Sequence, residues 1–193
     1  MKKIIFNDRY GLTQAVLEGR KTQTRRIVFK RDNEPPLQGI TSEYLIAVRS
    51  RYKLGETIAI AQKYDDLVKD DEFYRLCGIH GMPLECIKYE KGCTNKMFAR
   101  ADLMPHHIRI TRIRVERLQD ISEADCLKEG IWCDDNVGLE GTTYWYHGLA
   151  NSSFRTAKEA YAALIDKISG KGTWDSNPYV FAYDFETVSL PNT

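Results

Sequence analysis

The chain has 193 residues, with 28 lysines and arginines against 27 aspartates and glutamates. This length suits one domain with its own core, and we expect a single domain over residues 1–193. The balanced charge excludes a bulk polycation, so contact with nucleic acid would need a local basic patch. No stretch approaches the roughly 20 apolar residues of a membrane span, and the first residues do not resemble a signal peptide. We therefore expect a cytoplasmic protein that does not enter membranes.

The five cysteines favour free thiols over a disulfide framework, because their number is odd and the chain is long. Four possible zinc ligands lie close together in the sequence: Cys77, His80, Cys86 and Cys93. Their spacing lacks the paired C-x-x-C knuckles of structural zinc sites. We favour free thiols in an inserted loop and expect neither a metal nor another cofactor.

Secondary structure is predicted from periodicity and from residues that start or stop helices. In three segments, apolar residues recur at helical spacing between a capping residue and a glycine. Asn7 or Asp8 is the expected cap of the first of these helices. Four other segments have β-branched, aromatic or alternating patterns and predict strands. The expected helices cover residues 9–19, 122–130 and 156–169, and the expected strands cover residues 22–28, 57–62, 109–118 and 179–188.

The order of these elements predicts the fold class. Residues 30–43 contain proline and glycine and predict a loop, and residues 63–100 and 132–153 predict two irregular insertions. In the strand 109–118 the apolar residues change phase near Thr111, which predicts a β-bulge. Single helices separate the strands without regular βαβ alternation. We therefore expect an α+β fold, a small mixed β-barrel of five or six strands flanked by helices.

The most distinctive segment is residues 19–26, Gly-Arg-Lys-Thr-Gln-Thr-Arg-Arg. Guanidinium groups can hold phosphate oxygens bidentately, so the segment can bind an anionic or nucleotide-like ligand. A neutral Lys21 beside Thr24 can also supply a base and a nucleophile. A solvated basic turn is the third interpretation. The candidate ligand-binding residues are Arg20, Thr22, Arg25 and Arg26.

Two further groups of residues leave alternatives open. The aromatic side chains of the second insertion either stack on a nucleobase or form the core of that insertion. Three arginines around the strand 109–118 either bind a phosphate backbone or pair with nearby carboxylates. The aromatic residues are Trp132, Tyr144, Trp145 and Tyr146, and the arginines are Arg112, Arg114 and Arg117. His106 and His107 are expected to form a turn with one exposed ring, and Trp174 is expected to pack in the core.

Several motifs together resemble the ASCH domain, a family of the PUA-like superfamily of small β-barrels. A helix precedes Gly-Arg-Lys-Thr-x-Thr-x-Arg at residues 19–26, and a Gly-Glu strand start follows it. Residues 103–105 (Leu-Met-Pro), residues 114–121 (Arg-Val-Glu-Arg-Leu-Gln-Asp-Ile) and Trp-x-x-Asn-Pro at residues 174–178 complete the pattern. The resemblance is to larger bacterial and phage-related ASCH proteins. It runs from about Ile4 to Val188 and leaves both insertions outside the family pattern.

The resemblance implies two alternative activities. PUA-like domains commonly bind RNA, and some ASCH proteins have been described as ribonucleases. A short bacterial ASCH protein is instead an amidohydrolase that removes the acetyl group of acetylcytidine. Its reactive lysine, threonine and glutamate match Lys21, Thr24 and Glu129 of this sequence. The resemblance therefore implies hydrolysis of an acylated cytidine or related nucleoside, with an RNA-binding module as the alternative.

Two conditions follow for this trio. Side chains three residues apart lie on opposite faces of a regular strand, so a turn or bulge must bring Lys21 and Thr24 together. Lys21 must lose its proton to act as a base, and burial or a nearby cation lowers a lysine pKa. A Glu129 carboxylate close to Lys21 would instead raise the pKa of that lysine.

Overall fold

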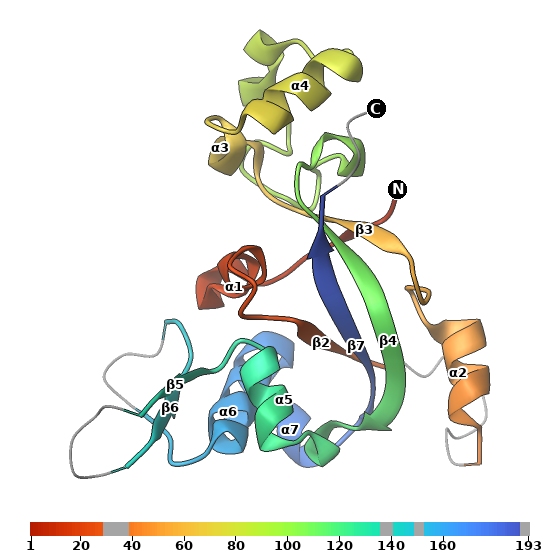
Figure 1. Cartoon of the computed structure of the whole chain (residues 1–193), viewed down its shortest axis with the longest axis vertical. Coiled ribbons are helices and arrows are strands. Elements are labelled where there is room, and N and C mark those ends of the chain that lie inside the picture. The colour runs from red at the N-terminus through yellow and green to blue at the C-terminus, as the bar shows by residue number, and fades with distance from the viewer. Residues whose placement is uncertain (29–38, 136–140, 149–152, 190–193) are drawn as a thin grey trace.

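The computed structural model describes residues 1–28, 39–135, 141–148 and 153–189. These residues form an α+β fold around a mixed five-stranded sheet (Figure 1). The strands of this sheet are β1 (Lys3–Ile4), β2 (Gln23–Ile27), β3 (Thr57–Ile60), β4 (His107–Arg117) and β7 (Tyr179–Val188). Their order is β1-β3-β4-β7-β2, so the two longest strands are neighbours near the middle of the sheet.

Antiparallel pairing between β4 and β7 organises the sheet, with β2 antiparallel to β7 and β1 parallel to β3. The register of β4 against β7 shifts between Ile110 and Arg112, which confirms the predicted bulge near Thr111. Among the described strands no pairing joins β1 to β2. The mixed sheet is therefore open in the described residues, and the predicted closed barrel is not confirmed.

Seven α-helices surround the sheet in the described residues. They are α1 (Leu12–Leu17), α2 (Ser42–Arg49), α3 (Tyr64–Leu67), α4 (Asp71–Ile79), α5 (Glu123–Lys128), α6 (Ala157–Ser169) and α7 (Thr173–Ser176). Helices α5, α6 and α7 gather at one end of the sheet and α3 and α4 at the other, while α2 flanks β4 (Figure 1). None of the described helices is long and apolar enough to cross a membrane.

The predicted starts of two helices are confirmed by their capping hydrogen bonds. The Ser122 side chain accepts from the backbone N–H of Asp125 at the start of α5. The Thr156 side chain accepts from the backbone N–H of Glu159 at the start of α6, which ends at the predicted Gly170. Each cap satisfies a backbone donor that the first helical turn leaves unpaired.

The helix predicted over residues 9–19 is present as α1, which ends just before Gly19 as expected but starts later than predicted. Residues Asp8–Tyr10 form a 3-10 turn, Gly11 adopts a left-handed conformation with φ of 62°, and α1 begins only after it. Asn7 makes no side-chain cap. The Asp8 carboxylate is no cap either, since it binds the Thr13 hydroxyl and the Lys96 ammonium.

Helix α2 was missed by the sequence analysis, which expected a loop over residues 30–43. Residues 30–38 of that loop lie outside the described residues. The remaining part ends at Thr41, whose side chain caps α2 by accepting from the backbone N–H of Tyr44.

The first insertion is more regular than predicted. Residues 63–100 contain α3, α4 and a 3-10 helix over Leu84–Tyr89, and they contribute most of a second hydrophobic cluster beside the main core. Tyr64 stacks on Phe73 inside that cluster, with ring centroids 5.4 Å apart. Apolar burial therefore gives this segment a core that its weak periodicity did not reveal.

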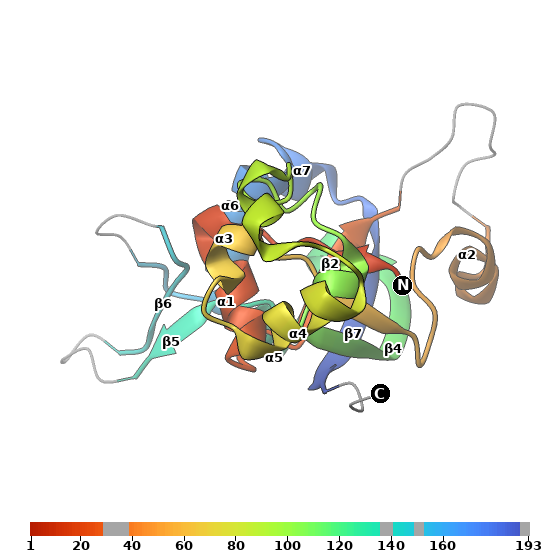
Figure 2. The same ribbon diagram turned by 90° about the horizontal axis from the view of Figure 1, so that it is seen from above.

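The second insertion contains a short hairpin, β5 (Trp132–Asp134) paired with β6 (Thr143–Trp145). Parts of the predicted 132–153 segment, residues 136–140 and 149–152, lie outside the described residues. Trp132 stacks on Trp145 with ring centroids 5.2 Å apart. The hairpin and α2 lie on opposite sides of the molecule (Figure 2).

Candidate active site

A cavity of about 450 Å³ lies between β2, α6 and the C-terminal end of α5. Lys21, Thr24 and Glu129 all line it, so the structure brings the expected trio to one place. Most of the other lining side chains are apolar and come from the N-terminal segment, α1, β2, the 3-10 turn after β4, α6 and the start of β7. They are Ile5, Phe6, Leu12, Ile27, Leu118, Leu164, Ile165, Ile168 and Val180.

Lys21 precedes the regular part of β2, which begins at Gln23. Its backbone N–H donates to the carbonyl of Ala15 in α1 rather than to a neighbouring strand. Thr24 lies within β2, opposite Tyr183 of β7. Because Lys21 stands in the turn before the strand, its side chain and that of Thr24 reach the same cavity. The turn that the sequence analysis required to bring these two side chains together is therefore present.

Glu129 is held at the end of α5, where it is the residue that terminates the helix. The Lys21 ammonium lies 2.5 Å from a carboxylate oxygen of Glu129 and donates to its backbone carbonyl at 2.8 Å. Only 2% of the Lys21 side chain and 5% of the Glu129 side chain are exposed. The lysine therefore both neutralises a buried carboxylate and binds a carbonyl that the helix end leaves unpaired.

Gly130 makes this close approach possible. Its φ of 102° lies in a region that residues with a side chain rarely adopt. A Cβ at this position would lie 3.3 Å from Leu12 and 3.7 Å from the aliphatic stem of Lys21. The absence of a side chain thus lets the end of α5 pack directly on α1 and on the lysine.

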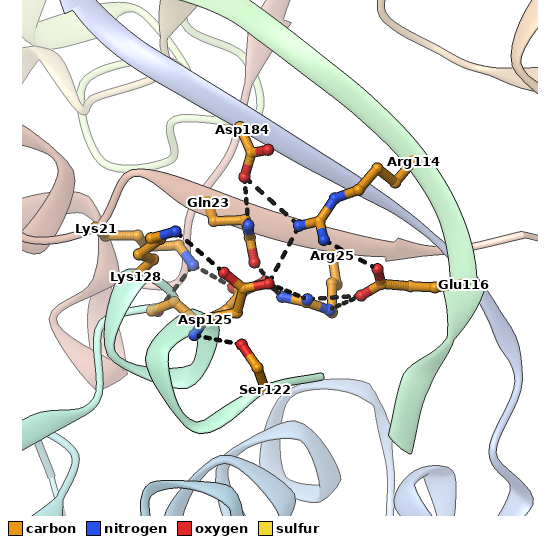
Figure 3. Close-up of polar contacts among 10 residues, drawn as sticks. Lys21, Gln23, Arg25, Arg114, Glu116, Ser122, Asp125, Lys128 and Asp184 are labelled. Carbon is orange, nitrogen blue, oxygen red and sulfur yellow. Dashed lines mark hydrogen bonds and ion pairs between the residues drawn. The ribbon is translucent and has the colours of Figure 1, made fainter. Parts of the chain in front are cut away.

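Arg25 holds Glu129 from the other side. Its guanidinium lies 3.0 Å from the second carboxylate oxygen of Glu129, 2.6 Å from Glu116 and 3.4 Å from Asp125 (Figure 3). It also donates to the side-chain carbonyl of Gln23 at 2.5 Å. Only 1% of the Arg25 side chain is exposed. Arg25 is therefore the centre of a buried ionic network, and each Glu129 oxygen has its own cation.

A second arginine completes this network at its more exposed edge. Arg114 contacts Asp125 at 3.2 Å, Glu116 at 3.4 Å and Asp184 at 3.7 Å (Figure 3). The Gln23 amide also donates to Asp184. Of the two alternatives for Arg114, the structure therefore confirms pairing with carboxylates and not an open surface for a phosphate backbone.

The environment of the trio shifts the proton affinity of Lys21. Burial lowers the pKa of Lys21 below its usual 10.5, while Glu129 opposes this and the positive charges of Arg26 and Arg25 add to it. Burial alone would also lower the pKa of Arg25. The surrounding carboxylates outweigh this effect, so the pKa of Arg25 lies above its usual value. Arg25 is therefore a permanent cation, whereas Lys21 is the group of this pair that can release a proton.

The remaining candidate binding residues are scattered. Arg20 lies 2.8 Å from the Glu18 carboxylate and stacks on Trp132 at 3.8 Å from the ring centroid, and it does not line the cavity. The backbone of Thr22 bonds Lys128 and Phe185, and its side chain does not line the cavity either. Arg26 is exposed and lines the cavity.

Tyr161 of α6 lines the cavity but was not among the site residues expected from the sequence. Its hydroxyl is buried and has no hydrogen-bond partner among the described protein groups. Burial and the nearby Glu129 charge raise the pKa of this phenol well above 10. It therefore keeps its proton and can donate a hydrogen bond. A helical repeat marks a buried side chain but cannot show whether its hydroxyl finds a partner.

Other predicted features have simple structural roles. His106 is partly exposed and His107 is buried, so one ring is exposed as predicted. The predicted turn at this pair is wrong, because His107 is the first residue of β4 and pairs with Ala59 and Val188. Trp174 packs edge-on against Tyr161, and Tyr146 packs against Phe154. In the described residues no group of three or more histidine, cysteine, aspartate or glutamate side chains is arranged to hold a metal ion.

Comparisons with known proteins show similarity only to solved structures, and this similarity is distant. No family model and no curated protein matches this sequence. Among solved structures, the chain is similar to the crystal structure of protein EF3133 from Enterococcus faecalis V583, described by the family-model DUF984. The similarity covers 98% of this chain and 78% of that chain, with 15% sequence identity and a TM-score of 0.46. A similarity this distant supports no functional inference, so the proposals below rest on the site itself.

We predict that Gly130→Ala destabilises the protein more than Gly55→Ala. Both glycines have positive φ, so alanine costs about 1–2 kcal/mol at each in backbone strain. Only at Gly130 does the new Cβ meet a packed neighbour, since nothing lies within 4 Å of the position at Gly55. Urea unfolding of both variants measures the difference, and equal losses of stability would contradict the packing argument.

We also predict that Arg25→Met lowers the free energy of unfolding by about 3–5 kcal/mol, because it leaves buried carboxylates without their cation. Arg75→Met is the matched control. Arg75 pairs with Glu72 on the surface, where water and salt screen the pair, so its loss should change stability little. Denaturant unfolding at neutral pH tests both variants, and a loss at Arg25 as small as that at Arg75 would refute the role given to the network.

Proposed function

We propose that this chain is an ASCH-type amidohydrolase that removes an acyl group from the amine of cytidine or a related nucleoside. The observation that carries the proposal is the buried Lys21–Glu129 pair beside Thr24 in a cavity with apolar walls. This is the residue set that an ASCH hydrolase would need. The proposal also includes the fold of this family, a PUA-like barrel. The five-stranded mixed sheet of the described residues would form part of that barrel.

In the first step, the Thr24 hydroxyl attacks the acyl carbon and transfers its proton to a neutral Lys21 amine. A threonine hydroxyl is a weak nucleophile, so this transfer is what activates it. The lysine becomes neutral by releasing its proton to solvent, because burial lowers the pKa of Lys21. The Tyr161 phenol lines the same cavity and can donate to the developing negative charge on the acyl oxygen.

In the second step, the carbon–nitrogen bond breaks and the leaving amine takes a proton from the Lys21–Glu129 pair. The acyl group then remains as an ester on Thr24. A water molecule, deprotonated by the same pair, hydrolyses that ester and restores the threonine. Arg25 keeps the Glu129 carboxylate oriented throughout, because it binds the oxygen that Lys21 does not contact.

The charge distribution favours this function over general RNA binding. Four of the basic groups that could contact a phosphate backbone have internal partners: Arg20, Arg25, Arg114 and Arg117. Since phosphate contacts need accessible cations, these groups contribute little to a broad basic surface. The RNA-binding module remains the competing outcome of the experiments below.

We predict that the wild-type protein hydrolyses an acylated cytidine and that Lys21→Ala lowers kcat by about 10²–10⁴-fold, the usual contribution of a general base. Lys21→Arg should fail as well, because a guanidinium does not lose its proton at working pH. Release of the free nucleoside is followed by chromatography. Lys88→Ala, at an exposed lysine of the first insertion, is the matched control and should keep full activity.

Two results would contradict this assignment. The first is full activity of Lys21→Arg, which would remove the lysine as a base. The second is a wild-type protein that hydrolyses no acylated nucleoside but binds oligoribonucleotides at low salt and releases them as salt rises. That pair of observations would make the RNA-binding module the better description.

The pH dependence follows from the burial of Lys21. A rate that depends on the neutral amine rises with pH until the lysine is deprotonated, and the midpoint should lie below 10.5 because burial lowers the pKa of Lys21. Measuring kcat/KM between about pH 6 and about pH 10 tests this profile. A rate that falls steadily over this range would show that the protonated lysine is the active form.

A further inference from the structure

A second cavity, of about 560 Å³, lies next to the first and carries a different charge pattern. Three arginines line it, and its remaining walls are apolar or aromatic. No carboxylate is among its described lining residues. The arginines are Arg26, Arg49 and Arg51, and the other lining residues are Ile5, Ile27, Val28, Val48, Tyr52, Phe181 and Tyr183. We call this cavity the arginine pocket.

The arginine pocket and the candidate active site share a wall. Ile5, Arg26 and Ile27 line both cavities, so Arg26 stands at the boundary between them. Its guanidinium donates to the backbone carbonyl of Ile5 at 2.7 Å, which holds the side chain at that boundary. A ligand in the first cavity therefore lies beside Arg26, which also lines the arginine pocket.

Two arginines of this pocket, Arg26 and Arg51, have little compensation of their charge among the described residues. In the described parts of the chain, neither Arg26 nor Arg51 forms a salt bridge with a carboxylate. Arg51 lies 5.6 Å from the centroid of the Tyr52 ring, and Glu56, the acidic residue nearby in sequence, is paired with Lys2. This contrasts with Arg25 and Arg114, whose charges are offset by several carboxylates. An anionic group would complement the charges of Arg26 and Arg51.

We propose that the arginine pocket binds a phosphate of the substrate, so that the preferred substrate is a nucleotide rather than a free nucleoside. This inference rests on the proposed function, because it assumes that the nucleoside occupies the first cavity. Guanidinium groups match phosphate oxygens through paired hydrogen bonds, and two such groups balance the double charge of a phosphate monoester. The apolar walls lower the local dielectric constant and strengthen that attraction.

The first test measures the preference between substrates. We expect the wild-type protein to hydrolyse an acylated cytidine monophosphate with a kcat/KM about tenfold or more above that for the acylated nucleoside, since charge-assisted hydrogen bonds to phosphate are stronger than neutral ones. The 5′- and 3′-monophosphates are assayed separately, and one of them must show the preference. Arg51→Gln should reduce it through KM. Arg75→Gln, which removes one positive charge from the distant α4, should leave it unchanged.

The second test does not depend on turnover. Calorimetry measures the binding of cytidine, of each cytidine monophosphate and of a short cytidine-containing oligoribonucleotide to the wild-type protein and to Arg51→Gln. A monophosphate that binds about tenfold tighter than cytidine, and loses this advantage in Arg51→Gln, supports a phosphate site. If only the oligoribonucleotide shows the advantage, the phosphate belongs to a strand, and the site is still supported.

The two proposals fail in different ways. If the wild-type protein hydrolyses acylated cytidine but neither phosphate form is preferred or bound more tightly, the phosphate site is refuted and the proposed function stands. If no acylated compound is hydrolysed but a monophosphate binds in an Arg51-dependent way, the proposed function is refuted and the phosphate site stands. Equal binding of all probes to the wild-type protein and to Arg51→Gln overturns the phosphate site outright.

Discussion

A lysine and a glutamate that are both removed from water must neutralise each other, and the chain around Lys21 and Glu129 is arranged to meet this constraint. The two residues are 108 positions apart in sequence, so α1, β2 and the end of α5 must be held together for the contact to exist. Gly130 allows the close approach, and Arg25 supplies a second cation to the same carboxylate. The pair therefore links three elements of the fold and at the same time creates a group with an unusual proton affinity.

The three arginines of the 19–26 segment have separate roles although they are close in sequence. Arg25 points into the protein and lies among carboxylates, Arg26 is exposed between two cavities, and Arg20 stacks on the β5–β6 hairpin. Alternation along β2 explains the opposite directions of Arg25 and Arg26. The inward arginine orients a side chain of the candidate active site, whereas the outward arginine is free to contact an anionic ligand. One strand thus serves both the stability of the site and its access to charged groups.

The two insertions contribute to the molecule in different ways. Residues 63–100 complete a hydrophobic cluster at the end of the sheet away from α5 and α6, and Lys96 extends from this segment to Asp8 beside α1. The hairpin β5–β6 instead follows directly after Gly130 and offers Trp132 to Arg20. The candidate active site lies between these regions, and none of its described lining residues comes from either insertion. The described residues that line the site therefore come from the sheet and its adjoining segments, from α1 and α6, and from the end of α5. The described parts of the insertions lie outside that lining.

Local sequence determined those features that depend on neighbours within a few residues. The caps at Ser122 and Thr156, the strand that ends at Val188 and the bulge near Thr111 follow from short patterns of polar and apolar residues. Tertiary structure alone decided the rest: the break at Gly11, the burial of Arg25, the pairing of Arg114 with Asp184 and the helix α2. An isolated motif shows that charges are present but not which carboxylates will face them. That outcome depends on which distant segments the sheet and its helices bring together, because burial sets both the strength of an ion pair and the proton affinity of its members.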